Sequence, residues 1–418
     1  MKFVHAADLH IDSPLRGLAH YEGAPVERVR LATRAALENL VTICIEEQAS
    51  FLVVAGDLFD NDWRDFNTAL FVVKQIQTLK RNGVAVYVIR GNHDSNDEMS
   101  YRVPWPDNLK LLSHRDPETV IREDLGVAVH GMSFPKRELR ENLVPRYPKP
   151  IADLLNIGLL HTNATGNLDH DSYAPCSVNE LVNKGYDYWA LGHIHQYAVL
   201  NDDGPRVVYA GNTQGRHIRE QGEKGCVVAT VERQEITSTQ FRSTDVLRWR
   251  RETIALEPDD GIDDLHDRAR DRLKAIADEV DGRLTAVRLE VRGRCRAHQR
   301  LVDETRRVET VNGLRTLPGE ISDDLWVEKV KFDTRPTIDR DQLRQGQDLL
   351  GDLLRDFDAI QGDESALLKL GDEVKSLSAK VGVELLNDEI DFADPGRIAA
   401  WLRAAEDDLL SRLTEHVV

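Results

Sequence analysis

In residues 1–243, short apolar runs alternate with longer stretches in which apolar residues recur every three or four positions. The short runs predict β-strands and the longer stretches predict amphipathic helices. We expect strands at 2–7, 51–55, 84–90, 127–132, 157–160, 188–190, 206–210 and 225–232, and helices at 26–47, 67–81 and 178–184. Strands that alternate with helices at this spacing predict a layered α/β domain.

The pattern changes near residue 244. The following residues predict the order strand, helix, strand, helix, strand, at 248–256, 262–280, 284–291, 296–310 and 325–332. From residue 337 the chain is acidic, with helical spacing at 349–357 and again at 395–413. Since 418 residues are too many for one compact core, we expect three domains: 1–243, a smaller α+β domain at 244–336, and a helical segment at 337–418.

Composition places the chain among folded proteins, with 41% hydrophobic and 30% charged residues. No run approaches the ~20 apolar residues that cross a bilayer, so no membrane association is expected. The first residues have the pattern of a core strand rather than of a signal peptide, which predicts a cytoplasmic protein. The cysteines are too far apart for a zinc ribbon or a disulfide framework, and they lie at positions 44, 176, 226 and 295.

The negative charge is unevenly distributed. The formal net charge is −18, and residues 337–418 contain 19 acidic and 9 basic side chains. Such a segment would repel a polyanion, whereas the preceding residues could bind one where their basic side chains cluster.

Five short motifs follow apolar runs in the first domain. They are Asp8-Leu9-His10, Gly56-Asp57, Gly91-Asn92-His93-Asp94, His161 and Gly192-His193-Ile194-His195. In α/β sheets, ligands collect beyond the carboxyl ends of the strands, where all five motifs are expected. Any one of them would be weak, since Gly, Asn and Asp are also typical of turns. Together and in this order, they predict a metal centre.

The donor set indicates which metals would bind. The predicted ligands are two carboxylates, one amide and four imidazoles: Asp8, His10, Asp57, Asn92, His161, His193 and His195. On an extended chain, residues i and i+2 point to the same side, so the first two could reach one ion. Mixed nitrogen and oxygen donors without a thiolate favour Mn²⁺, with Fe²⁺, Co²⁺ and Mg²⁺ as alternatives.

Two such ions ~3.5–4 Å apart can activate a water and orient a phosphoryl group. Asp57 is suited to bridging them, because a carboxylate has two oxygens. His93 is expected to protonate the leaving oxygen or to stabilise the developing charge, with Asp94 fixing its tautomer. The motifs therefore predict hydrolysis of a phosphate ester.

The combination DxH…GD…GNHD…H…GHxH resembles the signature of the calcineurin-like metallophosphoesterases. Residues 5–14 and 55–60 are similar to the bacterial SbcD-type DNA repair exonucleases, and residues 209–217 to the YhaO-like branch of that group. The resemblance implies a layered β-sandwich flanked by helices. It also implies that Asp8, His10, Asp57 and His195 hold one metal, and that Asp57, Asn92, His161 and His193 hold the other.

One position departs from part of that family. Some members have a second active-site histidine three residues after the bridging aspartate, and this chain has Asp60 there. A carboxylate cannot donate a proton at neutral pH unless its pKa is raised, so the role of Asp60 stays open.

A nuclease also needs phosphate contacts near the metals, and Arg216, His217 and Arg219 are the candidates. A second basic group lies at 292–307, where the alternative is a solvated helix face paired with acidic neighbours. By resemblance, residues 244–336 would be a DNA-capping domain. The tail would dock onto an SbcC-like coiled-coil ATPase unless it packs on its own domain, and a homodimer is also expected.

The leading hypothesis is a manganese-dependent DNA exonuclease or endonuclease subunit acting in DNA repair. One alternative keeps the metals but changes the substrate to a small phosphodiester or phosphate monoester. The other is a mainly regulatory scaffold for the ATPase partner.

Overall fold

The computed structural model describes residues 1–13, 25–60, 66–95, 103–164, 166, 173–280, 282–337, 343–378 and 394–414. Its internal contacts divide the chain into two compact units. The first comprises Met1–Arg251, Val280–Val287 and Asp323–Glu328, and the second comprises Glu252–Glu279, Arg288–Ser322 and Lys329–Val418. The division into three domains expected from the sequence stays a prediction.

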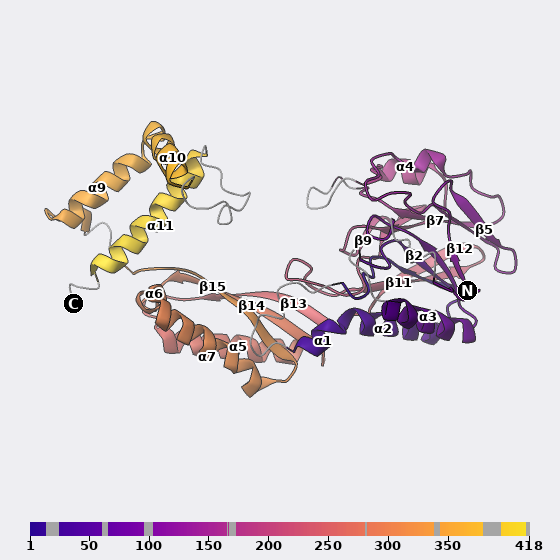
Figure 1. Cartoon of the computed structure of the whole chain (residues 1–418), viewed down its shortest axis with the longest axis horizontal. Coiled ribbons are helices and arrows are strands. Elements are labelled where there is room, and N and C mark those ends of the chain that lie inside the picture. Colours follow the sequence, from indigo (N-terminus) through magenta and orange to yellow (C-terminus); the bar gives the residue numbers. More distant parts are fainter. Residues whose placement is uncertain are drawn as a thin grey trace. The chain divides into compact units, whose positions relative to one another are not determined.

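The first unit contains two six-stranded sheets (Figure 1). One has the strand order β12-β11-β1-β2-β3-β4, in which β1 to β4 run parallel and β11 and β12 are antiparallel. Its strands are β1 (Lys2–Ala6), β2 (Phe51–Ala55), β3 (Ala85–Ile89), β4 (Leu109–Leu111), β11 (Gly225–Glu232) and β12 (Glu235–Ser243).

The other sheet has the order β5-β6-β7-β8-β10-β9, with four parallel inner strands and an antiparallel strand at each edge. Its strands are β5 (Glu118–Arg122), β6 (Val127–Gly131), β7 (Leu155–His161), β8 (Tyr188–Gly192), β9 (Ala198–Asn201) and β10 (Arg206–Tyr209). Side chains from both sheets form one buried cluster, in which Phe3 stacks on Phe51 and meets the edge of Tyr188. The two sheets therefore pack face to face as a sandwich.

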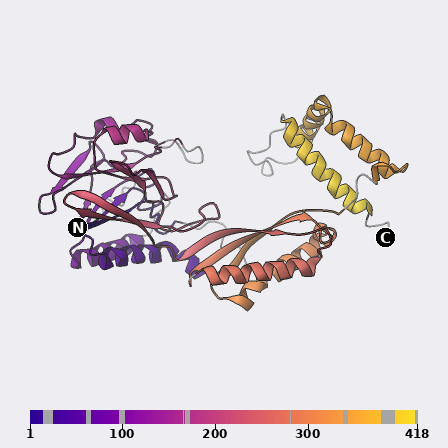
Figure 2. The same ribbon diagram turned by 180° about the vertical axis from the view of Figure 1, so that it is seen from behind.

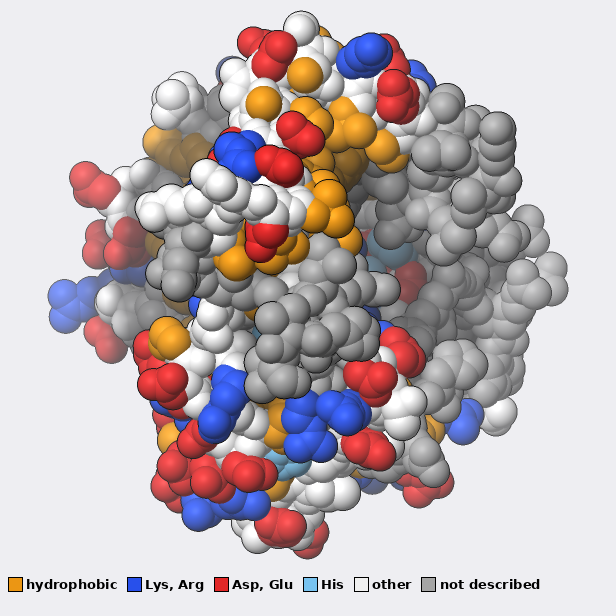
Figure 3. All heavy atoms as spheres, turned by 90° about the vertical axis from the view of Figure 1, so that its left-hand side faces the viewer, with side chains coloured by type: hydrophobic (Ala, Val, Ile, Leu, Met, Phe, Trp, Pro, Cys, Tyr) orange, Lys and Arg blue, Asp and Glu red, His pale blue; other side chains and the backbone are white. Residues whose placement is uncertain are grey.

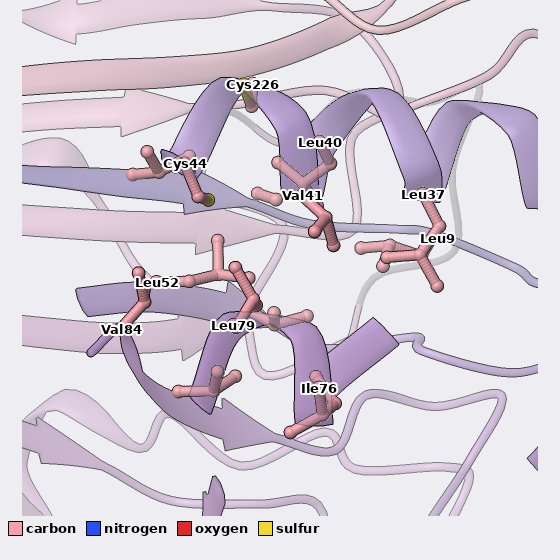
Figure 4. Packing of buried hydrophobic residues seen from close by; sticks show 14 of the residues in the cluster. Leu9, Leu37, Leu40, Val41, Cys44, Leu52, Ile76, Leu79, Val84 and Cys226 are labelled. Carbon is pink, nitrogen blue, oxygen red and sulfur yellow. The ribbon is translucent and has the colours of Figure 1, made fainter. Parts of the chain in front are cut away.

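Helices cover the outer faces of the sandwich. These helices are α2 (Ala32–Glu46), α3 (Phe66–Arg81) and α4 (Val178–Asn183), with a short 3-10 turn at Val144–Arg146. α1 (Val26–Arg30) precedes α2, and its Val29 lies in a separate buried cluster with Leu247 and Trp249. Leu40 of α2 and Leu79 of α3 pack with Leu52 of β2 in one buried cluster (Figure 4). Each fully buried side chain of this size contributes about 1.5–3 kcal/mol. On the second sheet, the indole of Trp189 donates a hydrogen bond to the Leu181 carbonyl of α4.

This architecture confirms the predicted fold class, a layered α/β sandwich flanked by helices. The prediction of one helix at 26–47 is wrong, because the chain leaves the helix at Leu31 and starts again at Ala32. Four strands were missed, and all four are sheet edges: β4, β5, β9 and β12. An edge strand is paired and covered less completely than a central one, so it does not require a continuous apolar run.

The smaller α+β part has the predicted order of elements. It contains β13 (Leu247–Ala255), α5 (Ile262–Glu279), β14 (Leu284–Arg294), α6 (His298–Val302), α7 (Glu304–Ile321) and β15 (Leu325–Arg335). β14 and β15 run parallel, because Thr285 N donates to Asp324 O near their starts and Cys295 N donates to Arg335 O near their ends. Figures 1 and 2 show α5 and α7 on one face of this three-stranded sheet.

The helix predicted at 296–310 is in fact two helices. α6 ends at Val302, and Asp303 caps α7 by accepting a hydrogen bond from the Arg306 amide at 2.9 Å. A capping carboxylate starts a helix because it satisfies an amide that has no partner within the helix.

Among the described residues after 343, the helices α9 (Leu349–Gln361), α10 (Glu364–Ser378) and α11 (Pro395–Thr414) pack on one another. α10 lies between the two helical stretches expected from the sequence. Large apolar side chains are exposed on these helices, at Leu349, Leu368, Val374 and Trp401. Figure 3, in which the left-hand side of Figure 1 faces the viewer, shows apolar side chains among charged ones. Over the described residues, no helix has the length and apolar character needed to span a membrane.

Candidate metal centre

The loops after β1 and β2 lie side by side. The amide of Asp8 donates to the Gly56 carbonyl at 3.1 Å, and the amide of His10 donates to the Asp57 carbonyl at 3.0 Å. Asp8, His10 and Asp57 have φ angles of 51°, 43° and 53°. The expectation that Asp8 and His10 share one side of an extended chain is therefore wrong. Their side chains converge because the backbone turns through the left-handed region, which non-glycine residues rarely adopt.

Three glycines allow the strand ends to approach closely. A Cβ at Gly56 would lie 2.3 Å from His161 Nδ1, and a Cβ at Gly91 would lie 2.3 Å from Asp57 Oδ1. A Cβ at Gly192 would lie 2.0 Å from the Ala55 carbonyl oxygen. A side chain at any of these positions would force apart the groups that form the site.

Asp57 occupies the centre of the predicted ligand set. Its Oδ2 lies 3.7 Å from His10 Nε2 and 3.6 Å from His161 Nε2, and its Oδ1 accepts a hydrogen bond from the His93 amide at 2.9 Å. Burial raises the pKa of Asp57 to about 6. The structure thus places this carboxylate between two imidazoles from different strand ends.

The hydrogen bonds of His161 determine its tautomer. Its Nδ1 lies 2.9 Å from the Ala55 carbonyl oxygen, which can only accept, so Nδ1 carries the proton. Burial lowers the pKa of His161 to about 3, which keeps the ring neutral. Its bare Nε2 faces Asn92 Oδ1 at 2.9 Å and Asp57 Oδ2. Lone pairs that converge without a shared proton suit a cation.

A second group of donors surrounds Asp8 and His195. His195 Nε2 lies 3.3 Å from His10 Nε2 and 3.9 Å from Asp8 Oδ1. The amide of His193 donates to both carboxylate oxygens of Asp8, at 3.2 and 3.0 Å. Burial and the neighbouring Asp57 charge raise the pKa of Asp8 well above its ordinary value. The His193 ring packs near His161, with ring centroids 5.2 Å apart.

These donors form two overlapping groups that could each hold a metal ion. Asp8, His10 and His195 form one group, and Asp8, Asp57 and His161 form the other, with ligand atoms within 4.8 Å of one another in each. Buried carboxylates beside neutral imidazoles need a positive charge between them. The residues therefore fit a pair of divalent cations.

His93 lies beside the ligands, and its ring partner corrects one prediction. His93 Nδ1 is 2.6 Å from Asp60 Oδ1. The carboxylate that bonds this ring is therefore Asp60, and not Asp94 as predicted. The Asp94 carboxylate instead accepts from the amides of Gly91 and Leu58, at 2.7 and 2.9 Å, and braces the loop. The sequence could not predict this role of Asp94, because its hydrogen-bond partners are backbone amides of two separate loops.

The charges of this pair are set by their contacts. Burial would raise the pKa of Asp60, but hydrogen bonds with His93 and with Ser13 hold it well below its usual range. Burial likewise favours a neutral His93, yet the hydrogen bond to Asp60 and the Asp57 charge raise the His93 pKa above its ordinary value. Asp60 therefore acts here as an ionised acceptor that favours a protonated imidazole.

The three predicted substrate residues have different surroundings. The Arg216 side chain is largely buried and lies 3.5 Å from Asp60 Oδ2 and 3.3 Å from Glu220 Oε1. His217 is exposed and lies 3.5 Å from Glu220, and Arg219 is exposed. The structure thus brings Arg216 to the centre, with the other two on the surface of the same loop.

Glu220 also contacts a predicted metal ligand, although no sequence pattern predicted this. Its Oε1 lies 2.8 Å from His195 Nδ1. In the sequence Arg-His-Ile-Arg-Glu, this carboxylate has the pattern of an exposed charged residue. It is also 25 residues from His195, so no local sequence pattern predicts that the two side chains meet.

The geometry described so far fits a pair of divalent cations, and known proteins with similar sequences point in the same direction. A model of the calcineurin-like phosphoesterase family matches residues 1–197, and a model of the middle domain of metallophosphoesterase YhaO matches residues 249–335. Residues 1–197 are thus similar to the calcineurin-like phosphoesterases, and residues 249–335 to the middle domain of YhaO.

The uncharacterized metallophosphoesterase YhaO of Bacillus subtilis (strain 168) is 38% identical over 257 residues, which span 61% of this chain and 63% of that protein. Among solved structures, a dimetal phosphatase from Danio rerio has 12% identity and a TM-score of 0.36, covering 58% of this chain and 96% of its own. A Thermus thermophilus protein has 11% identity and a TM-score of 0.34, covering 58% and 98%.

Proposed function

We propose that this chain hydrolyses phosphoesters with two divalent metal ions. The observation that carries the proposal is the position of Asp57, whose Oδ2 lies within 3.7 Å of imidazole nitrogens on two sides while His93 adjoins it. Asp8, His10, Asp57 and His195 would hold one ion, and Asp57, Asn92, His161 and His193 the other. When bound, the ions supply a water nucleophile and neutralise charge on the phosphoryl oxygens.

His93 is proposed as the general acid. Its Nδ1 is engaged by Asp60, so Nε2 is the ring nitrogen that would give a proton to the leaving oxygen. Asp60 fixes the orientation of the ring and favours its protonated form. Arg216 would contact a phosphate oxygen from the side of Asp60 and Glu220, since a guanidinium pairs well with phosphate.

DNA is the proposed substrate, and Mn²⁺ the proposed metal. The similarity of residues 5–14 and 55–60 to SbcD-type exonucleases supports DNA, and so does the presence of an additional α+β part, which a small substrate would not require. The nitrogen-rich donor set supports Mn²⁺ over Mg²⁺. A role in DNA repair in the cytoplasm belongs to the same proposal.

An SbcC-like ATPase is the proposed partner, and a homodimer the proposed assembly. The exposed apolar side chains of α9 to α11, such as Leu349 and Trp401, support a docking role for this segment. Mixing the purified chain with such an ATPase and measuring the mass of the complex by light scattering would test the partner. The mass of the chain alone would test the homodimer.

The function is tested by incubating the purified chain with Mn²⁺ and linear duplex DNA. We expect degradation by wild type, loss of degradation with His93→Ala, and equal metal content in the two proteins. The same samples are assayed with a cyclic nucleotide and with an aryl phosphate. Turnover of these compounds without DNA cleavage would show that the substrate is a small phosphoester and not DNA. If the metal-loaded chain hydrolysed no ester at all, the proposed enzymatic activity would be wrong.

A further inference from the structure

The Glu220 carboxylate is buried against the back of the metal centre, with 7% of the residue exposed. One oxygen, Oε1, lies 2.8 Å from His195 Nδ1. The other, Oε2, accepts from Asn212 Nδ2 at 2.9 Å and from the Arg216 amide at 2.7 Å. Oε1 thus faces the His195 ring, and both bonds of Oε2 come from the loop that carries Glu220.

The bonds of Oε2 hold the carboxylate in place independently of its contact with the His195 ring. The loop bonds of Oε2 come from a buried asparagine and from a backbone amide, so they fix the position of the carboxyl group. Oε1 also lies 3.3 Å from Arg216 Nη2 and 3.5 Å from His217 Nε2, both on the same loop. An acceptor fixed in this way can orient its hydrogen-bond partner instead of following it.

The contact determines which nitrogen of His195 can bind a metal. His195 Nδ1 lies 2.8 Å from Glu220 Oε1 and 3.4 Å from Arg216 Nη2, so the carboxylate is its nearer partner. An ionised carboxylate only accepts hydrogen bonds, which places the proton on His195 Nδ1. The lone pair of the neutral ring is then on Nε2, which lies 3.3 Å from His10 Nε2 and 3.9 Å from Asp8 Oδ1. With the opposite tautomer, Nε2 would present a hydrogen to the site and could not act as a ligand.

We propose that Glu220 is a positioning residue that holds His195 in the Nδ1-protonated tautomer and directs its Nε2 into the metal centre. The proposal rests on the metal centre of the proposed function. It adds the residue that prepares one ligand, and it implies that the metal site containing His195 depends on Glu220 more than the other site does. Outer partners of this kind typically change metal affinity by about 10–100-fold.

The test variant is Glu220→Gln, which keeps the shape but replaces one oxygen by an NH₂ group. Both oxygens of Glu220 face hydrogen-bond donors, so the NH₂ group of a glutamine would point a donor at other donors on one side. The matched control is Glu223→Gln on the same loop, where the exposed carboxylate pairs with Arg248 at 3.0 Å. Metal-free wild type and both variants are titrated with Mn²⁺ by calorimetry, and their folding is compared by circular dichroism.

We expect two Mn²⁺ ions to bind to wild type and to Glu223→Gln. For Glu220→Gln we expect one ion to bind about 10–100-fold more weakly and the other to bind nearly unchanged. A folded Glu220→Gln variant that binds both ions as tightly as wild type would overturn the positioning role. If wild type binds no divalent metal, the proposed function itself fails.

A second measurement does not depend on the folding of the variant. In metal-free wild type labelled with ¹⁵N-histidine, the long-range ¹H–¹⁵N spectrum reports which ring nitrogen carries the proton, and a His195→Gln sample identifies the signal. We expect the neutral His195 ring to carry its proton on Nδ1. A neutral ring with its proton on Nε2 would overturn the proposal even if Glu220→Gln did not fold.

Discussion

Asp60 Oδ1 and His93 Nδ1 are 2.6 Å apart, so the residue that departs from part of the family is the one that bonds the proposed catalytic histidine. Ser13 Oγ donates to the second oxygen of Asp60 at 2.6 Å, and Arg216 lies 3.5 Å from that same oxygen. Asp60 is thereby kept ionised and turned toward the imidazole. Its role in this structure is to orient and charge His93 rather than to donate a proton.

Replacing His93 by alanine should remove the general acid. We expect kcat to fall by about 10²–10⁴-fold, because proton transfer to a leaving group contributes on that scale. Steady-state kinetics on an ester with a poor leaving group measures the loss, and elemental analysis measures the bound metal. An ester with a good leaving group should be affected less, and an equal loss on both esters would contradict the role as acid.

Replacing Asp60 by asparagine should weaken His93 without removing it. Asp60 raises the pKa of His93, so its loss lowers that pKa, and the protonated acid should disappear at a lower pH. We therefore expect a smaller fall in kcat than for His93→Ala, with the alkaline limb of the kcat profile displaced to lower pH. An unmoved alkaline limb in a folded, metal-loaded variant would show that Asp60 does not act on His93.

Asp57→Asn tests the central carboxylate. An amide cannot supply two anionic oxygens, so we expect both metals to bind more weakly and elemental analysis to find little metal. In wild type, Mn²⁺ at 100 times its dissociation constant should stabilise the fold by about 2.7 kcal/mol, and this stabilisation should be lost in the variant. Asp124→Asn, at an exposed carboxylate paired with Arg122, is the control and should behave as wild type. Two tightly bound ions in Asp57→Asn would rule out a bridging role.

Gly192→Ala tests the close approach of two strand ends. The added Cβ would lie 2.0 Å from a backbone oxygen, so we expect the free energy of unfolding to fall by about 1–3 kcal/mol. Gly319→Ala is the comparison, since a Cβ there would meet nothing within 4 Å, and in a helix it should be neutral or stabilise by up to about 1 kcal/mol. Urea unfolding measures both, and equal stability of Gly192→Ala and wild type would contradict the described contact.

Glu47 gives a pH dependence of stability. The hydrogen bond from Lys2 Nζ at 2.7 Å lowers the pKa of Glu47 below its ordinary value of 4.5, with Arg242 adding to the effect against partial burial. A lowered pKa means that the contribution is complete above pH 4.5 and is lost as the pH falls through the folded-state pKa. Glu47→Gln should thus cost up to about 1 kcal/mol at pH 7 and nothing in acid, measured by urea unfolding. Glu123→Gln, on an exposed turn, is the control, and a pH-independent cost at Glu47 would refute the assignment.

Much of the fold follows from the sequence because central strands carry continuous apolar runs. β2 and β11 begin and end at the predicted residues, since they are buried between neighbours in the sheet. The four edge strands were missed because one side of an edge strand has no partner, which relaxes the apolar requirement. The break at Leu31 was missed because both halves of that stretch have the same helical spacing.

The sequence by itself determined which donors could meet, because residues that follow neighbouring parallel strands emerge at one edge of the sheet. It could not determine which side chain bonds which. That Asp60 and not Asp94 bonds His93, and that Glu220 lies behind His195, follow from contacts between loops 25 to 33 residues apart in the chain. Only the tertiary structure decides such contacts, because they depend on how the strands bring separate loops together and not on any local pattern.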